Sequence, residues 1–169
     1  SMDYKPTQNT NIISEFLADV QKLSSNGIHV FSQCDFLIHL CLHLFKEATV
    51  MAWVDMNRDL SLYKFCDLYF LIHEWLNENF YDKIRKRIID FGLQEECYYS
   101  LYYTKTLFDI NSGLLDRLLL DIKPQSTIYL NKVTDPEHNK IYRHDKSFTE
   151  WFFYKNRKRY LYDVTNEKA

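Results

Sequence analysis

Residues 36–48 read FLIHLCLHLFKEA, and this stretch decides the fold class. Its apolar side chains are almost continuous, which is typical of a helix that is buried on most sides. Ser32 and Asp35 precede it, and either side chain can accept backbone N–H groups at a helix N-terminus. The pattern therefore predicts a central helix that runs to about residue 53.

Helical patterns also cover most of the chain outside this stretch, as far as Pro124. The chain has only three glycines and three prolines, so residues that break helices are rare. Gly92 follows one apolar repeat directly and is well placed to end that helix. We expect further helices over residues 14–23, 62–79, 80–91, 94–110 and 113–122.

The pattern changes after Pro124. Residues 126–133 and 141–148 read as two short strands joined by the turn-forming sequence TDPEHNK, and residues 148–164 read as a closing strand or helix. The sequence thus predicts a mainly α fold, a bundle of about five to six helices with a small C-terminal β-hairpin appendage at about 124–150. Residues 1–11 are expected to be a flexible lead-in, and residues 12–169 a single domain.

Composition excludes several classes of protein. With 21 basic and 23 acidic residues, the net charge of −2 gives no global field for nucleic acid, which makes nucleic acid an unlikely partner. The basic runs KIRKR (83–87) and KNRKRY (155–160) are expected to be solvated surfaces. The longest near-apolar stretch, residues 36–45, is too short to cross a membrane. The four cysteines form no C-x-x-C pair, which favours a reducing, cytoplasmic location.

His39, His43 and Glu47 are spaced four residues apart, so a helix places them on one stripe. Three interpretations are open. The two imidazoles can share a metal, although Leu40 stands where a zinc peptidase motif needs a glutamate, and a third ligand would have to come from the next apolar helix. They can instead be structural, or they can line a pocket with Lys46 that recognises an anionic or polar ligand.

Lys64 and Asp67 share one face of the next apolar helix, LYKFCDLYFLI. An unpaired buried carboxylate is costly, so Asp67 is expected to have a partner or a function. Lys64, Lys46 or a histidine is the natural partner. An ion pair that clamps the two helices and a ligand-binding role are both compatible with this pattern.

The motifs HLCLHLFKEA and KFCDLYFLI, within residues 39–75, resemble the C-terminal helical half of the uncharacterised nucleotidyltransferase family, relatives of the polymerase-beta-like superfamily. The similarity continues through FGLQEECYYSLYYTKTLF and into FFYKNRKRYL near the end of the chain. The resemblance implies that these residues face an interdomain cleft and contact the acceptor or the nucleotide phosphates: His39, His43, Lys46, Glu47, Lys64 and Asp67.

The catalytic motif of that superfamily is not found. It consists of a Gly-Ser turn before a strand with a D-x-D pair that holds divalent ions, whereas the glycines here, at 27, 92 and 113, form no Gly-Ser pair. The resemblance thus implies a non-catalytic nucleotide- or acceptor-binding domain with no cofactor of its own. A complete enzyme would need a separate core that holds Mg with a nucleoside triphosphate. A protein interaction module with a structural His/Asp network, and a metal-dependent hydrolase, are the alternatives.

Overall fold

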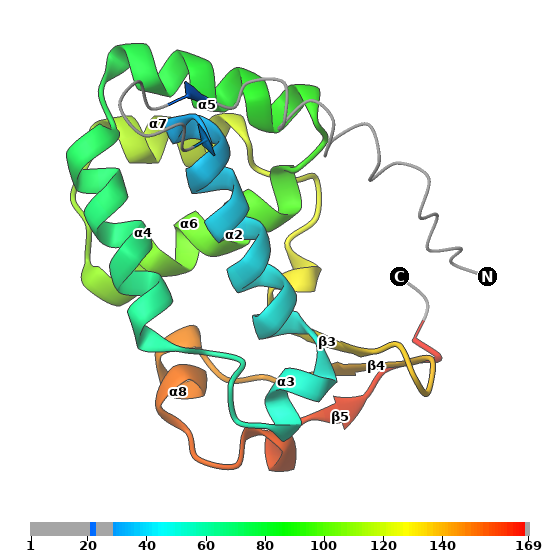
Figure 1. The fold of residues 1–169 in the computed structure, drawn as a ribbon. Helices are drawn as coiled ribbons and strands as arrows, with labels where there is room; N and C mark the ends of the chain where they lie inside the picture. Colours follow the sequence, from blue (N-terminus) through cyan, green and yellow to red (C-terminus); the bar gives the residue numbers. More distant parts are fainter. Residues whose placement is uncertain (1–20, 23–28, 168–169) are drawn as a thin grey trace.

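The computed structural model describes residues 21–22 and 29–167 and shows a mainly helical fold with a small C-terminal sheet (Figure 1). The predicted fold class is confirmed. The predicted lead-in over 1–11 lies outside the described residues. So does most of the helix expected over 14–23, but at its end Gln21–Lys22 form a strand, β1, that pairs with β2 (His29–Val30), so a helix is wrong there. The described residues contain seven α-helices: α2 (Gln33–Thr49), α3 (Met51–Asp55), α4 (Leu62–Trp75), α5 (Glu78–Asp90), α6 (Gln94–Phe108), α7 (Gly113–Asp121) and α8 (Phe148–Phe153).

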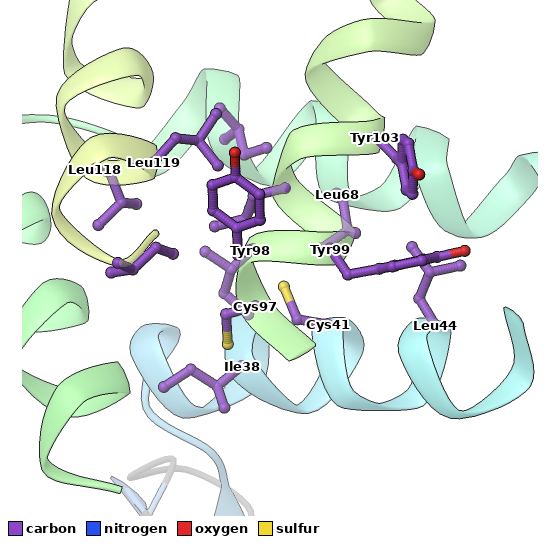
Figure 2. Close-up of a cluster of buried hydrophobic side chains, with 14 of the residues drawn as sticks. Ile38, Cys41, Leu44, Leu68, Cys97, Tyr98, Tyr99, Tyr103, Leu118 and Leu119 are labelled. Carbon is purple, nitrogen blue, oxygen red and sulfur yellow. The ribbon is translucent and has the colours of Figure 1, made fainter. Parts of the chain in front are cut away.

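Helix α2 is the central helix, as the sequence predicts. The Ser32 side chain accepts the backbone N–H of Asp35 and so caps its N-terminus. Helices α4 and α6 pack against α2, and their apolar side chains meet in one core (Figure 2). Burial of each such side chain stabilises the fold by about 1.5–3 kcal/mol. The fully buried members include Ile38, Leu44, Phe65, Leu68 and Leu101.

Helix α2 ends at Thr49, earlier than the sequence predicts. Val50 has an extended backbone (φ −114°, ψ 128°), which separates α2 from the short helix α3. Val50 forms a parallel bridge with Thr134, and the Thr134 hydroxyl donates to the carbonyl of Thr49 at 3.1 Å. The C-terminal sheet therefore breaks the helix at this point.

The other helix ends follow local capping. Helix α4 stops at Trp75 instead of continuing to 79, because Asn77 caps α5 by accepting the N–H of Phe80 at 3.0 Å. Gly92 has φ +66°, a conformation that favours glycine, and ends α5 as expected.

The C-terminal region forms a three-stranded antiparallel sheet in the order β3-β4-β5, from Lys132–Asp135, Lys140–Arg143 and Tyr162–Asp163. Strands β3 and β4 are the predicted hairpin, and the third strand comes from the predicted closing segment. Residues 128–131, expected in the first strand, form a 3-10 helix instead. The closing segment also contains α8, whose Ser147 and Glu150 form a capping box, and the 3-10 helix η3 (Arg157–Tyr160).

Two contacts attach the end of the chain to the helices. The ring of Phe65 on α4 lies 5.7 Å and 5.6 Å, centroid to centroid, from those of Phe148 and Phe152 on α8. The guanidinium of Arg157 pairs with the fully buried carboxylate of Asp59. None of the described helices has the length and apolar character needed to span a membrane.

Candidate functional site

The two histidines lie on the exposed stripe of α2. Phe36, His39, His43 and Lys46 all face solvent at helical spacing, while their helical neighbours point into the core. Glu47 borders this stripe, but it is buried, with a side chain that is only 7% exposed. The sequence therefore placed the histidines on one face correctly, and that face is open to solvent.

Lys64 joins α4 to this stripe. Its Nζ donates to Glu47 Oε2 and lies 3.1 Å from His43 Nδ1. His43 Nδ1 also lies 3.4 Å from Glu47 Oε1. The Lys64 side chain is 11% exposed and that of Glu47 is 7% exposed, so their ion pair is largely shielded from water. The pair holds α2 and α4 together beneath a histidine that is half exposed.

The protonation of His43 follows from this geometry. A lysine ammonium has only donors, and Lys64 Nζ lies closer to Nδ1 of His43 than Glu47 Oε1 does, so the geometry favours the tautomer in which Nδ1 accepts and the ring proton lies on Nε2. Partial burial lowers the pKa of His43, and the positive charges of Lys64 and Lys46 lower it further. His43 is therefore neutral at pH 7 and keeps one N–H for a ligand oxygen.

The described residues do not support the metal interpretation. The ring of His39 stacks against Phe31, with centroids 5.9 Å apart, and its centroid lies 6.2 Å from that of His43. Across the described parts of the chain, no three His, Cys, Asp or Glu side chains are grouped so that they can hold a metal ion. These described residues therefore do not fit a magnesium site either.

Asp67 is exposed on α4, so the expectation that it is a buried carboxylate in need of a partner is wrong. It lies on a solvent-facing stripe with Tyr63, Phe70 and Glu74. The apolar residues on this outer face made the helix look buried all round. The exposed carboxylate of Asp67 is accessible to a ligand, but because it is solvated it needs no partner to be stable in α4.

Two buried acidic groups were not singled out from the sequence. Asp35 pairs with Arg87 of α5 at 2.6 Å, and Asp59 pairs with Arg157. The sequence indicates only a helix-capping role for Asp35, and Asp59 is separated from its arginine by 98 residues. These pairs connect elements of the fold and lie apart from the α2 stripe.

The structure also contains two hollows that do not include the six predicted residues. One, of about 570 Å³, lies between the start of α2 and α5, and Lys83 and Lys86 line it. The other, of about 370 Å³, lies between the end of α4 and the α6–α7 loop, where Tyr69, His73 and Asp109 line it. The exposed members of the predicted set, His39, His43, Lys46 and Asp67, therefore lie on the surface outside these two hollows.

The fold and this face define a helical domain in which a shielded ion pair joins α2 to α4 beneath exposed histidines. The chain belongs to the uncharacterised nucleotidyltransferase family, whose model matches residues 3–109. Residues 110–169 lie outside the match, so the similarity expected for FFYKNRKRYL is not part of it. Comparisons with curated proteins and with solved structures return no match.

Proposed function

We propose that this chain is a helical nucleotide- or acceptor-binding domain of a nucleotidyltransferase and that it transfers no nucleotide alone. Family membership supports the class of reaction. In this proposal, a separate core supplies the carboxylates that hold Mg with the nucleoside triphosphate. The binding face consists of the exposed stripe of α2 and the neighbouring groups of α4, namely His39, His43, Lys46, Glu47, Lys64 and Asp67.

The orientation of His43 is the observation that carries this proposal. Its Nδ1 is held by Lys64, and its side chain is nevertheless 51% exposed. A neutral imidazole held in this way offers the Nε2 proton to a phosphate or hydroxyl oxygen without first having to be ordered. Lys46, one turn further along the same stripe, is exposed and has no carboxylate partner among the described residues, so its charge is available to a phosphate.

Isothermal titration calorimetry with ATP and Mg²⁺ tests the proposal. We expect weak binding that is lost in His43→Leu and in Lys46→Ala. His43→Gln retains an N–H donor and should keep part of the affinity, and Lys86→Ala on α5 removes an equal charge from another surface. Absence of heat with ATP, together with absence of heat with a separately produced catalytic core, would contradict the proposal.

The Lys64–Glu47–His43 network also favours a second candidate function. It clamps α2 to α4 without any ligand, as in a protein interaction module with a structural polar network. In that case His43→Leu lowers the melting temperature and leaves every nucleotide titration unchanged. Thermal unfolding with and without ATP separates the candidates, because ATP raises the melting temperature only of a protein that binds it.

A further inference from the structure

We propose that the surface around η3 binds single-stranded nucleic acid, a function separate from the nucleotide-binding face on α2. We call this the C-terminal basic surface. It combines exposed or half-buried aromatic rings with lysine and arginine side chains from two neighbouring segments: Lys146, Phe153, Tyr154, Lys155, Arg159 and Tyr160.

Arg157 fixes the backbone of this segment. Its Nε donates to Asp59 at 2.7 Å, and its Nη1 donates to the carbonyls of Phe152 and Tyr154 at 3.3 and 2.9 Å. Asn156 turns the chain just before it, with φ +58°. One arginine of the run KNRKR thus points inward and holds the loop, while Lys155 and Arg159 face solvent. The surface is ordered before any ligand arrives.

Two rings of this surface, those of Tyr154 and Tyr160, lie beside a lysine. The centroids of Tyr154 and Tyr160 are 4.6 Å apart, and Lys146 Nζ lies 5.6 Å from each of them. Phe153 is 71% exposed and Tyr160 is 40% exposed. Exposed rings beside cations are the combination that binds single strands, because bases stack on the rings and phosphates contact the cations.

The surface also has a local excess of positive charge. Lys158 is paired with Asp55 at 2.8 Å, whereas Lys155 and Arg159 form no ion pair with the described residues. Lys146 forms no ion pair with them within 4 Å either, although its charge helps to lower the pKa of Glu150. The net charge of −2 makes a global field for nucleic acid impossible, yet it says nothing about a local group of three cations. The expectation that nucleic acid is an unlikely partner therefore does not extend to this surface.

The basic run on α5 provides a matched control within the same chain. Its Arg85 pairs with Asp121 and its Arg87 with Asp35, whereas Lys83 and Lys86 are exposed and form no ion pair with the described residues. Both runs therefore present two such cations. The α5 run differs because the large apolar residues interleaved with it, such as Ile84 and Ile88, are buried in the core.

Fluorescence anisotropy with labelled oligo(dT) and oligo(U) tests the proposal on the full chain. Lys155→Ala/Arg159→Ala should weaken binding about tenfold. It should also make the slope of the logarithm of the binding constant against the logarithm of the salt concentration shallower by about 1.4, because each phosphate contact with a single strand contributes about 0.7 to that slope. Lys83→Ala/Lys86→Ala should change affinity by at most about twofold. Stronger binding of oligo(U) assigns the surface to RNA, and equal binding assigns it to single strands of either kind.

The rings are tested separately. Phe153→Leu/Tyr160→Leu keeps apolar bulk but removes stacking, and should weaken binding about fivefold, whereas Tyr160→Phe should bind like the wild type. Equal losses in the two double-alanine variants, wild-type affinity in the leucine variant, or tighter binding to anionic phospholipid vesicles than to either oligonucleotide would each overturn the proposal. Photocrosslinking of oligo(4-thiouridine) uses only the wild-type chain, so its result does not depend on whether a variant folds. Crosslinks confined to residues outside 146–160 would also overturn the proposal.

Discussion

The helical bundle and the C-terminal sheet are stabilised in different ways. One large apolar core spans α2, α4, α5, α6 and α7 and includes α8. The sheet has only a small cluster of its own, formed by Met51, Val54 and Val133. Besides the packing of Leu161 against the large core, the C-terminal region is attached by two long-range polar contacts, the pair Asp59–Arg157 and the bond between Thr134 and Thr49. The comparison indicates that apolar truncations will weaken the bundle, whereas polar changes will weaken the C-terminal region.

The largest expected effect is in the bundle. Phe65 is fully buried on α4 and contacts two rings of α8, so Phe65→Ala should lower the free energy of unfolding by about 3–5 kcal/mol. Phe70→Ala, on the exposed face of the same helix, should change it by less than about 0.5 kcal/mol. Urea denaturation measures both. Similar losses for the two variants would contradict this description of the core.

The next effect is in the C-terminal region. Arg157→Ala leaves the buried Asp59 carboxylate without its charged partner and should cost about 3 kcal/mol. Arg159→Ala removes the same side chain from the surface and should cost less than about 0.5 kcal/mol. Hydrogen exchange should show faster opening of η3 and β5 in the first variant only. If exchange accelerates equally throughout α2 and α6, the C-terminal region is not a separate cooperative unit.

Acid should weaken the C-terminal region before the bundle. His144 is buried, its Nδ1 has no hydrogen-bond partner in the described structure, and its ring stacks on Trp151 with centroids 4.0 Å apart. Burial lowers the pKa of His144 from 6.5 to about 4. As the pH falls, His144 is therefore protonated in the unfolded chain before it is protonated in the folded chain. The stabilisation that comes from the neutral, buried ring is complete above pH 6.5 and is lost as the pH falls toward 4.

The test compares the wild type with His144→Phe, which retains a ring against Trp151. Between pH 7 and pH 5 the wild type should lose about 1–2 kcal/mol more than the variant. If the free energies of unfolding of the two proteins change in parallel with pH, the pKa of His144 does not differ between the folded and unfolded states.

The sequence predicted most of the bundle because its helices have local signals. Ser32 caps α2, and Gly92 ends α5 at a position that favours glycine. The break at Val50 could not be predicted, since its cause is a bridge to Thr134, far along the chain. The same applies to Arg157, whose partner Asp59 is 98 residues away. Long-range polar contacts leave no periodic pattern in the sequence. Local sequence patterns therefore predicted the hairpin strands of the C-terminal region but not the contacts that attach this region to the helices.

The candidate site was predicted only in part, because some of its features depend on local spacing and others on the packing of two helices. The four-residue spacing correctly places His39 and His43 on one stripe of α2. The pairing of Lys64 with Glu47 needed the packing of α2 against α4, which spacing does not contain. Asp67 was misplaced because its helix carries apolar residues on its outer face as well as on its inner face.

The smallest expected effect concerns the polar network that joins α2 to α4, where the bundle, like the C-terminal region, uses a shielded ion pair. A double-mutant cycle of Glu47→Gln and Lys64→Met should give a coupling free energy of about 1 kcal/mol, since the pair is shielded from water but borders the surface. Nuclear magnetic resonance should show the Nε2–H tautomer of His43 in the wild type and a mixture of tautomers in Lys64→Met, because the donor to Nδ1 is then gone. A coupling near zero together with an unchanged tautomer would mean that Lys64 does not orient His43, and the proposed nucleotide-binding face would lose the rigidity on which it depends.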